Sequence, residues 1–94
     1  MKITEVRIRK LSMDGKLKAY ATVTFDDCFV VHNIKVIDGR DGLFIAMPSR
    51  KTIEGTYMDV AHPIDPIFRT KLQDVILSEY NANHIGEAKI SVVD

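Results

Sequence analysis

The segment from Lys16 to Phe25 alternates strictly between polar and apolar side chains, and this alternation constrains the fold more than any other feature of the chain. Because successive side chains of a strand point to opposite faces, the pattern predicts a half-buried β-strand. Lysine, tyrosine and threonine fill the face that should meet solvent. The apolar face consists of Leu17, Ala19, Ala21, Val23 and Phe25.

Two further strands are predicted beside this one. In KITEVRIRK, Val6 and Ile8 fall on one face and two arginines on the other, and the Asp14-Gly15 dipeptide that follows favours a tight hairpin. After a short turn, the run CFVVHNIKVI has consecutive apolar residues at 29–31. Such a run predicts a central strand that is covered on both faces over its first half, with Cys28 packed in the core.

A shorter strand and a second hairpin are predicted next. The loop DGRDG precedes LFIAM, which is typical of a short buried strand, and Pro48 ends that strand. SRKTIEG then forms the tip of a hairpin in which Gly55 supplies the turn and TYMDVAH returns. The basic pair Arg50 and Lys51 is therefore expected just past the end of a strand.

One long helix is predicted near the C-terminus. Asp65 is a suitable N-cap and Pro66 a suitable first helical residue. The apolar residues that follow fall within an arc of about 100°, so the helix should lie on the sheet and end between Asn81 and Asn83. The arc holds Phe68, Leu72, Val75 and Ile76, with Tyr80 at its edge.

Together these elements predict an α+β fold, a twisted and mostly antiparallel sheet of four to five strands with one long C-terminal helix. A single domain is expected over residues 1–81, followed by a short tail over 82–94. In the tail, Ile90, Val92 and Val93 either add an edge strand, pack against a partner or belong to a disordered segment. Because one helix covers only part of such a sheet, we expect a homodimer.

The composition limits the partners and the compartment. Thirteen Lys and Arg balance thirteen Asp and Glu, so a polyanion can be bound only where cations cluster locally. No segment has the pattern of a secretory signal or a membrane span, so no membrane association is expected. The single cysteine cannot form an intramolecular disulfide. These features favour a cytoplasmic protein.

The sequence offers no constellation for catalysis or metal binding. Cys28 and His32 would lie about 13 Å apart along a regular strand, which is too far to share a metal ion. His62 is explained by a rigid entry to the helix before Pro63, and no glycine-rich phosphate loop connects a strand to a helix. We therefore expect no enzymatic activity, cofactor, metal or small-molecule substrate, and a structural role for Cys28, His32 and His62.

The cations are more informative. Arg7 and Arg9 share a strand face on which Glu5 or solvent is their natural partner, so this face is interpreted as solvated. Arg50 and Lys51, in contrast, have no acidic neighbour before Glu54.

Two further cations, Arg69 and Lys71, lie in the first half of the helix, where the macrodipole disfavours positive charge. They are 200° apart and flank the buried stripe on opposite sides, so a symmetric dimer would be needed to gather such groups. From the residues alone, nucleic-acid binding and a solvated, protein-binding surface are both open.

The order of motifs resembles that of the bacterial septation regulator SpoVG family. The similarity rests on TEVRIRK, FVVHNIKVIDG, GLFIAMPSRKT, GTYMDVAHPI and the helix ending in ILSEY, and it covers residues 2 to 81. The tail after Asn81 does not match the family pattern, and the longer acidic extensions of many relatives are missing from it.

The resemblance implies a small dimeric regulator of gene expression that binds DNA selectively, and also RNA, and that affects septation, cell division and sporulation. It implies no catalytic activity. The family's nucleic-acid surface maps onto Arg50, Lys51, Arg69 and Lys71. The competing expectation is an adaptor of the division machinery that binds proteins and not nucleic acid.

Overall fold

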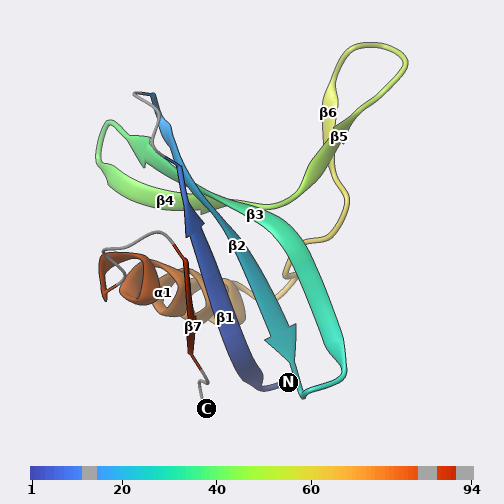
Figure 1. Ribbon diagram of the computed structural model, residues 1–94. Coiled ribbons are helices and arrows are strands. Elements are labelled where there is room, and N and C mark those ends of the chain that lie inside the picture. Colours follow the sequence, from blue (N-terminus) through green and yellow to red (C-terminus); the bar gives the residue numbers. More distant parts are fainter. Residues whose placement is uncertain (12–14, 83–86, 91–94) are drawn as a thin grey trace.

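The computed structural model describes residues 1–11, 15–82 and 87–90 of the chain. Five strands form one antiparallel sheet in the order β4-β3-β2-β1-β7, and two short strands form a separate ladder. The strands are β1 (Ile3–Lys10), β2 (Leu17–Phe25), β3 (Phe29–Gly39), β4 (Gly42–Ala46), β5 (Ser49–Lys51), β6 (Tyr57–Asp59) and β7 (Glu87–Ile90). Helix α1 (Pro66–Ala82) lies across one face of the large sheet (Figure 1). The predicted α+β fold is confirmed.

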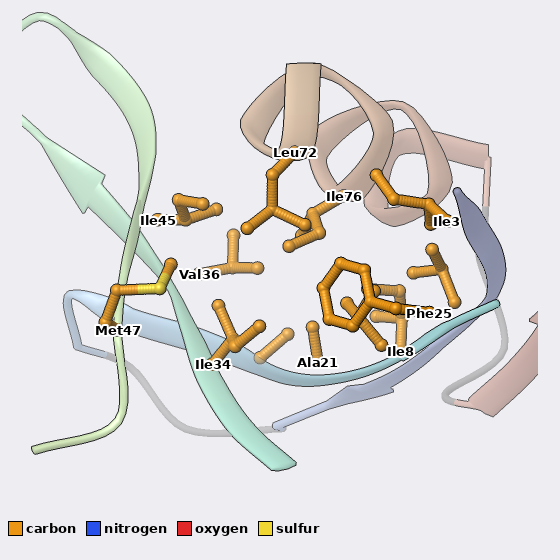
Figure 2. Packing of buried hydrophobic residues seen from close by; sticks show 13 residues of the cluster. Ile3, Ile8, Ala21, Phe25, Ile34, Val36, Ile45, Met47, Leu72 and Ile76 are labelled. Carbon is orange, nitrogen blue, oxygen red and sulfur yellow. The ribbon is translucent and has the colours of Figure 1, made fainter. Parts of the chain in front are cut away.

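The core lies between α1 and the sheet face turned toward it (Figure 2). The alternation in β2 has the predicted outcome, because Ala19, Ala21 and Val23 are fully buried. From the helix, Leu72 and Ile76 are buried, while the remaining residues of the predicted stripe are partly buried against this cluster. Each fully buried aliphatic side chain of this kind stabilises the fold by about 1.5–3 kcal/mol.

The helix begins where the sequence predicts. The backbone N–H of Ile67 donates to Oδ1 of Asp65 at 3.3 Å, and Pro66 is the first helical residue. A second polar contact ties the helix to the sheet edge, where the N–H of Ile45 in β4 donates to Oε1 of Gln73 at 3.2 Å. These contacts fix both the start of α1 and its position along β4.

Register shifts in the ladders change the faces of some residues. Leu17 pairs with Ile37 whereas Ala19 pairs with Val36, so Leu17 and Ala19 lie on opposite faces. The predicted placement of Leu17 on the buried face is therefore wrong. A single extra residue in one strand produces this change, and alternation alone does not reveal it.

A second bulge lies in β3. There Val23 pairs with Val31 and Ala21 with Ile34, so β3 carries one more residue than β2, and Asn33 has a φ of +63°. Bulges bend a strand and increase its twist. The spacing of Cys28 and His32 along a regular strand consequently does not apply.

Three predictions about the middle of the chain are corrected. The central strand of the sheet is β2, and not β3 as predicted. The first half of β3 is not covered on both faces either, because β4 pairs with β3 only over residues 35–39, and Phe29 is 61% and Val30 43% exposed. Cys28 lies exposed in the turn before β3 and does not pack in the core. In β4, Ile45 is buried but Phe44 is exposed, so this strand is not buried throughout.

The end of the chain supports one of the three alternatives for the tail. Strand β7 pairs antiparallel with β1, with Ile90 opposite Val6, so this part of the tail adds an edge strand. Asp14 of the predicted first hairpin turn and the tail residues Val92 and Val93 lie outside the described residues.

Candidate nucleic-acid interface

Residues 48–60, which include β5 and β6, form a hairpin that we call the arm. It projects away from the sheet and helix (Figure 1). The N–H of Val60 donates to the carbonyl of Pro48 at 2.7 Å and closes the base of the arm. At the tip, the N–H of Thr52 donates to the carbonyl of Thr56 at 2.7 Å, and Gly55 turns the chain with a φ of +90°. The predicted hairpin is confirmed.

The arm carries the predicted basic pair. Arg50 and Lys51 lie within β5, between the base and the tip of the arm, and not just past the end of a strand as predicted. In register, Arg50 is opposite Met58 and Lys51 is opposite Tyr57, so the two cations point to opposite faces of the arm. Both are exposed, and among the described residues neither has a carboxylate within 4 Å. The arm therefore presents a cation on each side.

The aromatic neighbour of Lys51 is not evident from the sequence. Tyr57 lies directly across the ladder from it and is 71% exposed. A cation beside an exposed aromatic ring is a combination that binds both phosphates and bases. Only the pairing register of the hairpin reveals it, because the two residues are separated by the whole turn.

The helical cations lie elsewhere. Arg69 is exposed and sits one turn before Gln73, whose side chain reaches β4. Lys71 is partly buried and near Asp74 on the outer side of α1. The two flank the buried stripe as predicted, and the structure does not bring them together with Arg50 and Lys51 in one chain.

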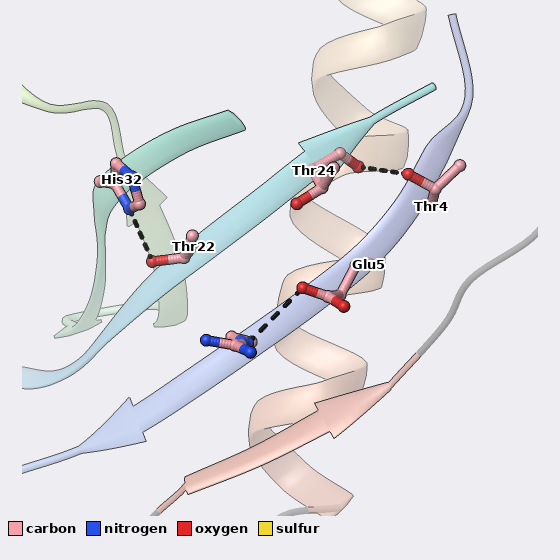
Figure 3. Close-up of polar contacts among 6 residues, drawn as sticks. Thr4, Glu5, Thr22, Thr24 and His32 are labelled. Carbon is pink, nitrogen blue, oxygen red and sulfur yellow. Dashed lines mark hydrogen bonds and ion pairs between the residues drawn. The ribbon is translucent and has the colours of Figure 1, made fainter. Parts of the chain in front are cut away.

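The sheet face turned away from α1, which we call the open face, has polar side chains (Figure 3). Arg7 Nε lies 3.5 Å from a carboxylate oxygen of Glu5, the partner expected for it. On the neighbouring strands, Thr22 Oγ1 lies 3.4 Å from Nδ1 of His32, which is itself exposed. These contacts fit the interpretation of this region as a solvated sheet face.

One row of the open face is different. Arg9, Tyr20 and Lys35 lie opposite one another on β1, β2 and β3. The guanidinium carbon of Arg9 is 5.7 Å from the centroid of the Tyr20 ring. The sequence does not indicate Lys35, because its place beside Tyr20 depends on the bulge at Asn33.

The structure also bears on catalysis and membranes. Within the described ranges, no group of three or more His, Cys, Asp or Glu side chains could hold a metal ion. The ring of His62 contacts the carbonyl of Pro63 at 3.1 Å, in line with a role at the entry to the helix. No helix in this part of the chain is long and apolar enough to cross a membrane.

The fold and the arm define a small α+β protein with one helix-covered sheet face and a projecting basic hairpin. The chain belongs to the SpoVG family, whose model matches residues 1–82. It is 64% identical over 88 residues to the SpoVG protein of Thermoanaerobacter sp. (strain X514), a match that covers 94% of this chain and 96% of the relative.

Two further relatives are also similar over most of their length. The chain is 61% identical over 80 residues to SpoVG of Alkaliphilus oremlandii, covering 85% of this chain and 86% of the relative. It is 54% identical over 94 residues to SpoVG of Clostridium kluyveri, covering 96% and 98%. The name of each relative refers to septation. The resemblance noted in the sequence is thus confirmed.

Proposed function

We propose that this chain is a cytoplasmic regulator of gene expression that binds DNA selectively, with RNA as a second ligand, and that acts in septation, cell division and sporulation. The names of the relatives support the septation role. The proposed contact residues are Arg50, Lys51, Arg69 and Lys71. No enzymatic activity, cofactor or small-molecule substrate is part of the proposal.

The observation that carries the proposal is the arm. Arg50 and Lys51 lie in β5 of a hairpin that projects from the body, and Tyr57 is opposite Lys51 in the ladder. The chain has no net charge, so binding to a polyanion depends on such a local cluster. Contacts of this kind to phosphates hold a protein on nucleic acid, whereas base contacts provide selectivity.

Selectivity is assigned to the helix. Arg69 is exposed on α1, and a guanidinium on a helix can contact a guanine edge with two hydrogen bonds. A single chain does not gather Arg69 with the arm cations, so we propose a homodimer in which two arms and two helices contribute to one surface. A monomer in sedimentation at tens of micromolar would contradict this arrangement.

A second candidate function is supported by the apolar residues of the arm. Ile53, Met58 and Val60 are all exposed on the arm, and exposed apolar side chains of this kind are typical of a protein-binding surface. The chain would then be an adaptor of the division machinery, with the neighbouring cations as solvated charges.

A salt series separates the two functions. Binding to random and selected duplexes is measured by fluorescence anisotropy from low to physiological salt. A nucleic-acid-binding protein should lose affinity linearly on a plot of log affinity against log salt, and the selected duplex should bind more tightly. No duplex affinity at low salt would leave the adaptor as the function.

A further inference from the structure

We infer that the open face binds a single-stranded segment of nucleic acid, in a groove between the sheet and the base of the arm. The inference rests on the proposed function and assigns to it a second surface, with a ligand form different from the duplex proposed for the arm. It starts from a groove of about 830 Å³. Its polar lining consists of Arg9, Tyr20, His32, Asn33, Lys35 and Ser49.

The charged side chains that line the groove are all positive. Arg9 and Lys35 are part of its lining, whereas no Asp or Glu is. The carboxylate of Glu5 is 3.5 Å from Arg7, outside this lining. In a chain without net charge, a groove with cations and no acid is selective for an anionic ligand.

The row of Arg9, Tyr20 and Lys35 has the chemistry of a nucleotide platform. Tyr20 occupies the middle strand and is partly buried, so its ring is held while one part remains open to the groove. Its cationic neighbours are one strand away on either side, about 5 Å each at the backbone. A base stacked on the ring would have its flanking phosphates within reach of both cations.

The position of Arg9 is compatible with this ligand. Its guanidinium carbon lies 5.7 Å from the ring centroid, near the outer limit of a cation–π contact. A planar guanidinium is itself a stacking surface for a base, so it contributes whether it stays over Tyr20 or moves to a phosphate.

The shape of the groove favours a single strand over a duplex. One wall is the base of the arm, with Pro48, Ser49 and Val60, and another is the exposed start of β3, with Phe29 and Val30. The bases of a duplex are stacked on one another and cannot lie on a ring at the floor of such a groove. An unpaired base can enter it, and the apolar walls then cover its faces and edges.

The groove is continuous with the arm. Ser49 lines it and is followed directly by Arg50 and Lys51, of which Lys51 shares a strand face with Ser49. A single strand leaving the groove along β5 therefore meets a further cation and Tyr57 opposite it. The only acid on this face of the ladder is Asp59, opposite Ser49.

The test compares labelled dT12, U12 and a random 20-base-pair duplex on the full chain. Tyr20→Leu keeps apolar bulk but removes the stacking ring, and Tyr20→Phe restores it. We expect Tyr20→Leu to weaken binding of the single strands about 5- to 150-fold, with Tyr20→Phe near wild type and the duplex affinity unchanged. Comparing dT12 with U12 shows whether DNA or RNA is the preferred source of the strand.

A second pair of variants guards against a folding defect in Tyr20→Leu. Arg9→Gln/Lys35→Gln should flatten the salt slope for single strands by about 1.4, at roughly 0.7 per phosphate. The matched control Lys16→Gln/Arg40→Gln removes two exposed cations that do not line the groove, and it should leave the slope unchanged.

The outcomes separate this inference from the proposed function. If the wild type binds the duplex but no single strand, the inference is wrong and the proposed function stands. The same holds if neither Tyr20→Leu nor Arg9→Gln/Lys35→Gln reduces the affinity for single strands. If wild type binds none of the three probes, the proposed function fails together with the inference. If both variants lose affinity for single strands and retain duplex binding, the inference is supported.

Discussion

Replacement of the basic pair by Arg50→Ala/Lys51→Ala is expected to weaken nucleic-acid binding without affecting the fold. Both side chains are exposed on the arm and lack a carboxylate partner within the described residues. The core between α1 and the sheet does not include them. The free energy of unfolding should therefore change by no more than about 0.5 kcal/mol.

The effect on binding follows from counting phosphates. If each cation neutralises one phosphate, the double change removes two contacts per chain and four per dimer. At roughly 0.9 per contact, the slope of log affinity against log salt should flatten by up to about 3.6 for a dimer and about 1.8 for a monomer. Since phosphate contacts carry no sequence information, specific and random duplexes should weaken together.

The assay is a paired measurement of duplex anisotropy across a salt series and thermal melting on the same preparations. Lys16→Ala/Arg40→Ala is the matched control, because it removes the same charge from two exposed residues outside the arm. An unchanged salt slope and unchanged affinity in Arg50→Ala/Lys51→Ala would refute the reasoning. An equal loss in the control would show that charge matters but the arm does not.

Three other predictions concern the helix. Arg69→Ala should cost about 1–3 kcal/mol of discrimination at one base position, seen as lost preference in competition between selected and single-site-altered duplexes, and a uniform loss across sites would indicate a phosphate contact instead. Ile76→Ala, at a fully buried position facing the sheet, should lower the free energy of unfolding by about 2–5 kcal/mol in urea titrations, and a change below 1 kcal/mol would contradict the packing described. Asp65→Ala removes the acceptor for the N–H of Ile67 and should cost about 1 kcal/mol by the same measurement, whereas Asp65→Asn should retain most of the stability.

The parts of the fold that were predictable depend on local chemistry. Alternation in β2 identified its buried residues from Ala19 onward, and Asp65-Pro66 located the start of α1. The hairpin from Ser49 to Asp59 followed from a glycine at the turn and two short segments around it. In each case the residues that determine the structure are close together in the sequence.

The predictions that were wrong failed for a different physical reason. A run such as Phe29 to Val31 is apolar whether its partner is the same chain or another molecule, so exposure of this edge could not be predicted from it. The bulge at Asn33 requires only one residue with positive φ, and it changes the register without altering the apolar pattern.

The candidate site was predictable only in part. The sequence shows that Arg50 and Lys51 have no acidic neighbour before Glu54, and both side chains are exposed in the structure, as this pattern suggests. The row of Arg9, Tyr20 and Lys35 was not visible, because it combines three strands and depends on their register. A cluster assembled across a sheet leaves no spacing pattern along the chain.

The arm also has a consequence for the local stability of the molecule. Its own hydrogen bonds, at Val60 to Pro48 and Thr52 to Thr56, are separate from the ladders of the large sheet. Opening of such a unit exposes little of the core, so the free energy of opening that limits amide exchange should be smaller for the arm than for β2. We therefore expect the hairpin to open and close while the sheet and helix remain intact, and we expect a ligand bound to it to slow amide exchange first at Thr52 and Val60.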